Sequence, residues 1–195
     1  LIKEARFRYP ASFEEIDFGL ARNLDKNMLL RLSESRCSER HQNILLTGAT
    51  GVGKSFLVQA LGHQGCMYGF RTGYYPCSKL FTHLKLARDD GSYLKELARI
   101  QKQDLFILDD LGLEPFDAPG RLSLLEILED RLRRKSSIIV SQIPINKWHE
   151  AIGDPTIADA ICDRIVHSAH RIELKGESVR KLYARREIEQ ERKSE

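Results

Sequence analysis

The chain has 195 residues, which is the length of a single domain or of one domain with a small appendage. With 42% hydrophobic and 30% charged residues, 13 glycines and 6 prolines, its composition excludes collagen, low-complexity disorder and disulfide-stapled miniproteins. The 31 lysines and arginines against 28 acidic residues give a net charge of +3, which by itself does not indicate a nucleic-acid binder. What matters is therefore how that charge is distributed along the chain.

Features typical of a membrane protein or of an oxidising compartment do not occur in the sequence. No apolar run approaches the roughly 18 residues of a membrane span, and the first residues lack the apolar region of a secretory signal. No two cysteines form a C-x-x-C pair, so neither a zinc site nor a redox motif is predicted. We expect Cys37, Cys66, Cys77 and Cys162 to be free thiols of a cytosolic protein.

Short apolar runs alternate with helical patterns along the chain, after an expected first helix over 21–35. We expect strands over 43–47, 70–75, 104–109, 137–141 and 171–174, and helices over 54–64, 78–88, 92–103, 119–134, 155–167 and from 178 towards 193. Strands that are apolar without alternation and are separated by helices indicate a parallel sheet covered on both faces. The predicted class is therefore an α/β three-layer sandwich with a central parallel sheet.

A phosphate-binding motif follows the first of these strands. The segment Gly48-Ala49-Thr50-Gly51-Val52-Gly53-Lys54-Ser55 matches G-x-x-x-x-G-K-[ST] and is placed between a strand and a helix, as a P-loop requires. Its glycines let backbone N–H groups point at phosphate oxygens, and the following helix presents the positive end of its dipole. We expect Lys54 to reach the β- and γ-phosphates and Ser55 to bind Mg²⁺. The residues expected to contact the nucleotide are Gly48, Ala49, Thr50, Gly51, Val52, Gly53, Lys54, Ser55 and Phe56.

Two adjacent acids, Asp109 and Asp110, end the apolar strand that begins at Leu105. Acids at the end of a buried strand are unfavourable unless they are solvated or used. Ligands of open α/β sheets bind at the carboxyl ends of the strands, where the P-loop also lies. We therefore expect Asp109 to bind Mg²⁺, and Asp110, on the other face of the strand end, to polarise an attacking water. For either residue, a plain solvated acid is the alternative.

These motifs resemble the IstB/DnaC-type AAA+ ATPases, and within them the IstB branch, ATP-dependent helpers of insertion-sequence transposases. Beyond the P-loop, the resemblance depends on Asp109-Asp110-Leu111-Gly112, on Ser141-Gln142-Ile143-Pro144 with Trp148, and on 176–180; it extends from about residue 13 to the C-terminus. It implies an N-terminal segment over 1–40 and an AAA+ ATPase domain over 41–195 with a C-terminal helix and only a minimal lid. Relatives carry a further N-terminal helical segment, which we expect to be missing here because the chain does not begin with Met.

The resemblance also implies roles for four residues outside the Walker motifs. Ser141 and Gln142 stand where AAA+ proteins have sensor 1, although many relatives have Asn in place of Gln142. Arg164 stands at the arginine-finger position, which would reach the γ-phosphate bound by a neighbouring subunit. Arg180 stands at the sensor 2 position, in contact with this chain's own nucleotide. The implied cofactors are ATP and Mg²⁺, and the implied location is the bacterial cytoplasm, at the nucleoid.

The basic residues are not evenly spread. Between Arg164 and Arg186 seven lysines and arginines face two glutamates, a local charge of +5. A second basic stretch over 79–102 contains four residues near one side of a predicted helix, which we expect to contact DNA: Lys79, Thr82, Lys85 and Arg88. Basic patches attract phosphate backbones without reading sequence. An ordinary solvated helix face is the alternative for each of these residues.

We therefore expect a bacterial transposase helper that self-assembles with ATP on duplex target DNA, remodels that DNA, and hydrolyses ATP slowly as a switch. Its expected partners are duplex DNA, the transposase and further copies of itself. The first alternative is a DnaC-like helicase loader that binds single-stranded DNA. The second is a small-molecule kinase, which would be monomeric and would transfer the phosphoryl group without DNA.

Overall fold

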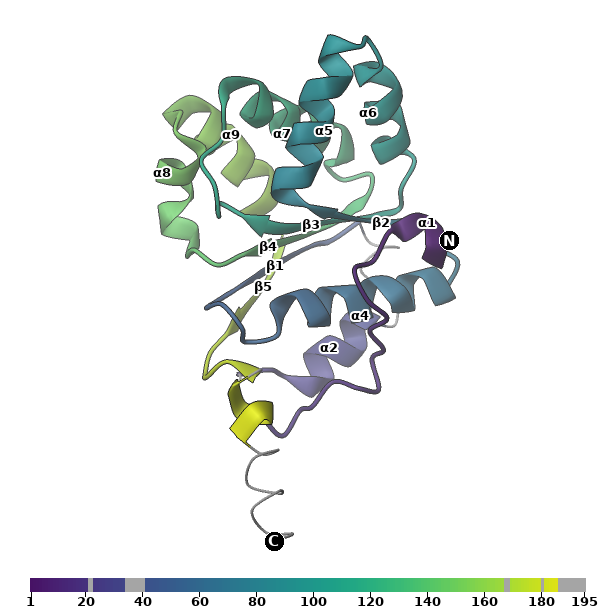
Figure 1. Ribbon diagram of the computed structural model, residues 1–195, viewed down its shortest axis with the longest axis vertical. Coiled ribbons are helices and arrows are strands. Elements are labelled where there is room, and N and C mark those ends of the chain that lie inside the picture. The colour runs from purple at the N-terminus through teal and green to yellow at the C-terminus, as the bar shows by residue number, and fades with distance from the viewer. Residues whose placement is uncertain (21–22, 34–40, 167–168, 180, 186–195) are drawn as a thin grey trace, which may run out of the picture.

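The computed structural model describes residues 1–20, 23–33, 41–166, 169–179 and 181–185, and its centre is a five-stranded parallel sheet (Figure 1). The strand order is β2-β3-β4-β1-β5. The strands are β1 (Asn43–Gly48), β2 (Thr72–Pro76), β3 (Leu105–Leu111), β4 (Ser136–Ser141) and β5 (Ala169–Leu174). The carboxyl ends of β1, β3 and β4 therefore meet at one edge of the sheet, where the P-loop and the two acids lie.

Helices cover both faces of the sheet, which confirms the predicted three-layer α/β sandwich (Figure 1). One layer contains α5 (Cys77–Asp89), α6 (Tyr93–Gln101), α7 (Ala118–Arg131), α8 (Trp148–Ile152) and α9 (Pro155–Val166). The other contains α4 (Lys54–Met67) and α2 (Lys26–Ser33), with the short α1 (Ile2–Ala5) beside β2. Successive side chains of β3 alternate between the two cores, with Ile107 on the α4 side and Phe106 and Leu108 on the α7 side. Residues 105–108 of β3 are all apolar because both faces of this strand are buried.

The N-terminal segment packs onto the α4 side of the sheet. Ala11, Ile16 and Leu20 are buried, and the first two join the core beneath α4. The Phe7 ring lies so close to α4 that a Cβ on Gly62 would come within 2.8 Å of it, so only glycine fits there. The segment before β1 is therefore held against the element that follows the P-loop.

The observed elements differ from the predicted ones mainly at their ends. The predicted helix 21–35 begins later, at Lys26, as α2, and its predicted last residues, 34 and 35, lie outside the described residues. The predicted strand 70–75 also begins later, at Thr72, because the backbone N–H of Phe70 still donates to Gly65 at the end of α4. The sequence missed the 3-10 helix η1 (Ile145–Lys147) and α8, which are too short to show a period. Of the predicted last helix, residues 181–185 are helical, and 186–193 lie outside the described residues. Within the described part of the chain, no helix is long and apolar enough to cross a membrane.

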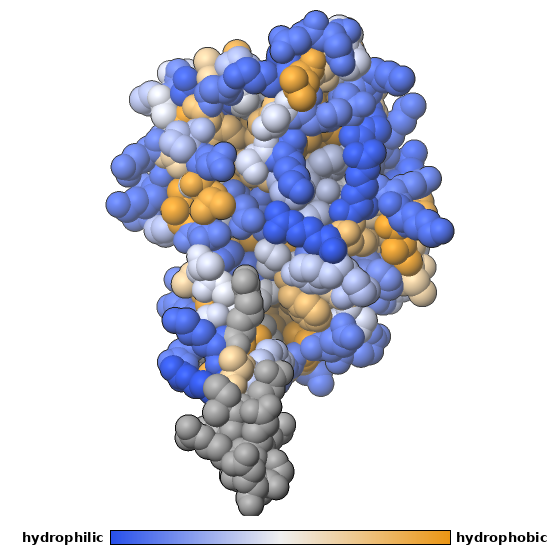
Figure 2. All heavy atoms as spheres, viewed as in Figure 1, coloured by the Kyte–Doolittle hydropathy of each residue, from blue (hydrophilic) through white to orange (hydrophobic). Residues whose placement is uncertain are grey.

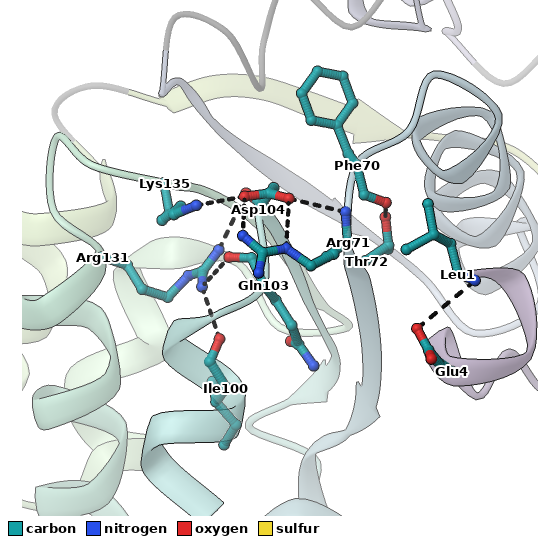
Figure 3. A network of polar contacts seen from close by, with 10 residues as sticks. All are labelled: Leu1, Glu4, Phe70, Arg71, Thr72, Ile100, Gln103, Asp104, Arg131 and Lys135. Atoms are coloured by element: carbon teal, nitrogen blue, oxygen red, sulfur yellow. Dashed lines mark hydrogen bonds and ion pairs between the residues drawn. The ribbon is translucent and has the colours of Figure 1, made fainter.

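A buried arginine bonds to several carbonyls at the amino ends of β3 and β4, opposite the P-loop (Figure 3). Arg131 ends α7 with 2% of its surface exposed, and its guanidinium donates to the carbonyls of Ile100 (3.2 Å), Gln103 (3.0 Å) and Ser136 (2.6 Å). Burial lowers its pKa to about 10. Beside it the carboxylate of Asp104 pairs with Lys135 and with Arg71, at 3.2 Å from the Arg71 Nε. One side chain thus satisfies carbonyls at the end of α6, in the loop after it and at the start of β4.

Replacing Arg131 by Met should lower the free energy of unfolding by about 3 kcal/mol, because it leaves several buried carbonyls without a donor. Urea denaturation followed by circular dichroism measures this. The exposed Arg134, three residues further on, provides the control, and Arg134→Met should change the stability by less than about 0.5 kcal/mol. Equal effects of the two substitutions would contradict the structural role of Arg131.

Candidate active site

The P-loop connects the end of β1 to the start of α4. Gly51 has φ 87°, and a Cβ there would approach the Ser178 Oγ to 2.4 Å, so the position requires glycine. The N-cap of α4, Gly53, has φ 96°. The backbone N–H of Val179 donates to the Gly51 carbonyl at 2.9 Å, which fixes the C-terminal segment against the loop. The arrangement confirms the strand–loop–helix context that the motif needs, with the helix N-terminus available to an anion.

Lys54 is buried at the floor of this loop, with 5% of its surface exposed. Its Nζ donates to the carbonyls of Gly48 (2.6 Å) and Ala49 (2.8 Å). Burial lowers the pKa of Lys54, while the nearby carboxylates of Asp110 and Asp109 act in the opposite direction. The ammonium group is thus positioned inside the loop, between its carbonyls and the acids of β3, where a phosphate can replace the carbonyl contacts.

Asp109 is completely buried at the end of β3. Its Oδ2 accepts a hydrogen bond from the Tyr74 hydroxyl at 2.5 Å, and its carboxylate also accepts one from the Ser55 side chain. Burial raises the pKa of Asp109, although these two donors lower it. Asp109 and Ser55, the two predicted Mg²⁺ ligands, are therefore in direct contact.

Asp110 lies in a β-bulge that the sequence does not predict. The register of β3 against β4 shifts between Leu108 and Leu111, and Asp110 adopts φ 64°, a left-handed conformation unusual for a residue with a side chain. The strict alternation that would turn Asp110 to the opposite face is therefore broken. Its side chain lines the same cavity as Lys54, with Oδ1 3.3 Å from the Gln142 Nε2 and Oδ2 3.9 Å from the Arg8 guanidinium.

The two predicted sensor residues of β4 are placed differently. Gln142 reaches the cavity, where its Oε1 accepts a hydrogen bond from the Thr50 hydroxyl at 2.5 Å and its amide donates to Asp110. Ser141 is completely buried; its hydroxyl donates to the Leu111 carbonyl at 2.8 Å and accepts from the Ile143 N–H at 3.2 Å. Ser141 thus joins the ends of β3 and β4, and its sensor role stays a prediction, whereas Gln142 links Thr50 of the P-loop to Asp110.

A cavity of about 910 Å³ lies over the P-loop. Its polar end is formed by P-loop residues with Asp110 and Gln142. Sequence reasoning found Phe56 but missed most of the apolar end, which comes largely from the N-terminal segment and the C-terminal helix: Tyr9, Pro10, Ile16, Leu20, Val179 and Tyr183. The Tyr9 and Phe56 rings stack with centroids 6.3 Å apart. The aromatic residues before Pro10 were the available signal, but only the fold brings them to the loop.

The residues present fit ATP with Mg²⁺. The polar end offers backbone N–H groups, a helix N-terminus and an ammonium group to phosphates, and the apolar end offers flat side chains to a base. In the described ranges, no group of three or more His, Cys, Asp and Glu side chains could hold a metal ion. Ser55 and Asp109 offer two oxygens, and Mg²⁺ usually takes one or two from the protein and completes its shell with phosphates and water.

Arg164, the predicted arginine finger, lies away from the cavity. Arg164 is on α9, and its carbonyl accepts from the Asn43 side chain at 3.5 Å, at the first residue of β1, whereas the P-loop follows the last. The length of β1, roughly 16 Å, thus separates it from this chain's own phosphate site. Its guanidinium contacts Glu129 at 3.0 Å and the Ala160 carbonyl at 2.8 Å. Arg180 lies outside the described residues.

The four predicted DNA contacts on α5 have different surroundings. Arg88 stacks over the Tyr93 ring at 3.6 Å and donates to Ser123, so it is committed within the fold. Thr82 and Lys85 line a cavity of about 490 Å³, where Lys85 pairs with Asp117 at 3.2 Å. Lys79 lines a different cavity, beside β2. Arg88 is therefore held within the fold, and the DNA contacts of Lys79, Thr82 and Lys85 stay a prediction.

A parallel sheet of this order, with a P-loop after β1 and an acidic end on β3, defines a P-loop NTPase of the AAA+ class. The chain belongs to the family of IstB-like ATP binding proteins, whose pattern matches residues 1–187. It is 45% identical over 185 residues to the insertion sequence ATP-binding protein y4pL of Sinorhizobium fredii, covering 95% of this chain and 76% of that protein. It is 30% identical to the insertion sequence IS21 ATP-binding protein of Pseudomonas aeruginosa, covering 92% of this chain and 68% of the relative.

Solved structures share the fold. The chain superposes on DnaI with a TM-score of 0.68 at 22% identity, covering 85% of this chain and 91% of that one. On domain III of the Thermotoga maritima replication initiation protein DnaA the TM-score is 0.69 at 16% identity, covering 94% and 77%. At these identities the likeness concerns the fold alone.

Replacing Asp109 by Asn should raise the free energy of unfolding of the nucleotide-free protein by about 1 kcal/mol at neutral pH, because it removes a buried charge. The variant would lose a predicted Mg²⁺ ligand. Between the ordinary pKa of 3.8 and the raised native value, the folded wild-type protein binds more protons than the unfolded chain, so its stability falls as pH rises. Asp109→Asn has no carboxyl group to ionise at this position, so its stability relative to wild type should increase as pH rises. Urea denaturation from acid to neutral pH measures it. The exposed Asp89→Asn should show no such trend; a less stable Asp109→Asn at neutral pH would contradict the account.

Proposed function

We propose that the protein is an ATP-dependent helper of a bacterial transposase, which assembles on duplex target DNA, remodels it, and hydrolyses ATP slowly as a switch. Two observations support this. Its relatives y4pL and the IS21 protein are named as insertion sequence ATP-binding proteins, and the site has the groups that binding and hydrolysing ATP require.

The proposed chemistry assigns a task to each side chain. Residues 48–56 hold the phosphates and Lys54 neutralises their charge. Ser55 and Asp109 hold Mg²⁺, which when bound withdraws charge from the phosphoryl group. Asp110 orients and deprotonates the attacking water, and Gln142 links its position to that of the P-loop through Thr50. We further propose that Arg180 contacts the nucleotide of its own chain.

The position of Arg164 is the single observation that carries the proposal of self-assembly. It lies at the sheet edge opposite the chain's own P-loop, so it can approach a γ-phosphate only in another copy. Such a contact is heterologous, because the surface around Arg164 in one copy meets the ATP cavity of the next copy. Repeated contacts of this type generate rings or helical filaments. Assembly of this kind also multiplies weak DNA contacts.

A helicase loader that binds single-stranded DNA is the second candidate, and the shared fold of the DnaC helicase loader favours it, with a TM-score of 0.66 at 21% identity. The preferred DNA separates the two functions. A preference for duplex supports the transposase helper, and a preference for single strands supports the loader.

Replacing Arg164 by Ala should leave ATP binding by the monomer unchanged but abolish ATP-dependent assembly on duplex DNA and lower turnover at least tenfold, because an arginine finger supplies charge in trans. Sedimentation velocity with ATP, with and without duplex, measures assembly, and phosphate release measures turnover.

Two further variants separate the finger from its ion pair. Arg164→Lys keeps the charge but loses the planar fork, and should assemble poorly. Glu129→Gln removes the ion pair and keeps the arginine, and should assemble at least as well as wild type. Normal assembly and turnover of Arg164→Ala would rule out the finger.

A further inference from the structure

A basic groove follows the outer edge of β2, which pairs only with β3 in the described sheet. It consists of two cavities, of about 370 and 410 Å³, that share Arg6 and Arg99 and so form one depression. Its charged lining comprises Arg6, Arg8, Arg71, Lys79, Arg99, Lys102 and one acid, Glu4. The basic stretch over 79–102 supplies Lys79, Arg99 and Lys102, and only the fold adds Arg6, Arg8 and Arg71 to them.

The positive charge of the groove is not neutralised by its surroundings. Arg99 shares Glu96 with His83, and Arg71 shares Asp104 with Lys135. With Glu96, Asp104 and Asp110 included, six basic residues face four acids, a local charge of +2. A concentration of one charge sign in a depression attracts a polyanion, because low-dielectric walls focus the field.

Three of the basic residues, Arg6, Lys79 and Lys102, form no ion pair with any described residue, and all three are exposed. Arg6 also has φ 59°, a left-handed conformation that is unfavourable for a residue with a side chain. The backbone at the end of α1 is thus held in a strained turn that directs the chain along the groove. Strain of this kind gathers at binding sites, where the surrounding structure maintains it.

Arg8 connects the groove with the ATP cavity, since it lines both. Its backbone N–H donates to the buried Gln59 side chain at 2.6 Å, which fixes its position against α4. Its guanidinium lies 3.9 Å from the Asp110 carboxylate and 5.9 Å from the centre of the Tyr74 ring, whose hydroxyl bonds to Asp109. An anion in the groove competes with Asp110 for the same guanidinium. Figure 2 shows that hydrophilic side chains cover most of the face it views, with scattered hydrophobic patches.

We infer that the basic groove binds the phosphate backbone of DNA and that Arg8 couples its occupancy to Asp110 in the ATP site. The inference rests on the proposed DNA-dependent function and adds to it the surface on which DNA binds. Guanidinium and ammonium groups suit phosphate oxygens, and contacts of this kind carry no sequence specificity. DNA bound here draws Arg8 away from Asp110 and frees that carboxylate to act on water.

The test uses the variant Arg6→Asn/Lys79→Gln/Lys102→Gln, which removes three charges outside the ATP site; asparagine suits the left-handed backbone at residue 6. The control is Arg133→Asn/Arg134→Gln/Lys147→Gln, which removes three charges from exposed residues elsewhere, with Arg133 likewise left-handed at φ 58°. Fluorescence anisotropy with ATP and Mg²⁺ measures binding of a labelled duplex, and of a single strand of equal length, at several salt concentrations. Binding of a fluorescent ATP analogue verifies the folded site in each protein.

We expect the groove variant to bind duplex at least tenfold more weakly than the control, with the slope of log affinity against log salt reduced by about 2 to 3. Its ATP binding should be unchanged, and its ATP turnover should no longer rise when DNA is added. If wild type binds duplex and the groove variant binds it as tightly as the control does, the inference that DNA binds in the groove is wrong, while the proposed function stands. If wild type binds neither form of DNA, both are overturned. If wild type binds the single strand more tightly than the duplex, the groove binds a single strand. That result would contradict the proposed role as a transposase helper.

Discussion

The architecture depends on keeping an ammonium group and a carboxylate buried together at the carboxyl edge of the sheet. Lys54 and Asp109 are both removed from water, and burial shifts the pKa of each toward its neutral form. Isolated buried charges are strongly unfavourable, so the P-loop carbonyls, Tyr74 and Ser55 must hold them. Nucleotide phosphates with Mg²⁺ would complete the same set of charges. Nucleotide with Mg²⁺ would therefore relieve the unfavourable burial of these two charges in the empty site.

The two edges of the sheet have different tasks in this account. The carboxyl edge holds the ATP cavity, and the opposite edge holds the Arg131 network and Arg164. The basic groove lies along the unpaired side of β2, the outer strand of the described sheet. Arg8 lines both this groove and the ATP cavity. A single copy thus presents an ATP site, a group that can act on a neighbouring copy's ATP, and a surface suited to DNA. Assembly on DNA would engage all three.

The sequence predicts what depends on local spacing. The P-loop pattern placed Lys54 and Ser55, and the apolar run before Asp109 identified its strand, because both signals lie within a few residues. It did not predict the bulge at Asp110 or the burial of Ser141, which arise from register between β3 and β4. Nor did it find Arg8, whose contacts with Gln59 and Asp110 join residues 51 and 102 positions apart. Contacts of that range follow from topology, and no local period contains them.

The central claim is that the cavity over the P-loop binds ATP with Mg²⁺ through Lys54. Isothermal titration of the wild-type protein and of Lys54→Ala with ATP and Mg²⁺ tests it most directly. The account predicts saturable binding to wild type and at least a hundredfold weaker binding to the variant, about 2.7 kcal/mol, since a buried charge that meets the phosphates is lost. Unchanged affinity in a Lys54→Ala protein that remains folded would contradict it.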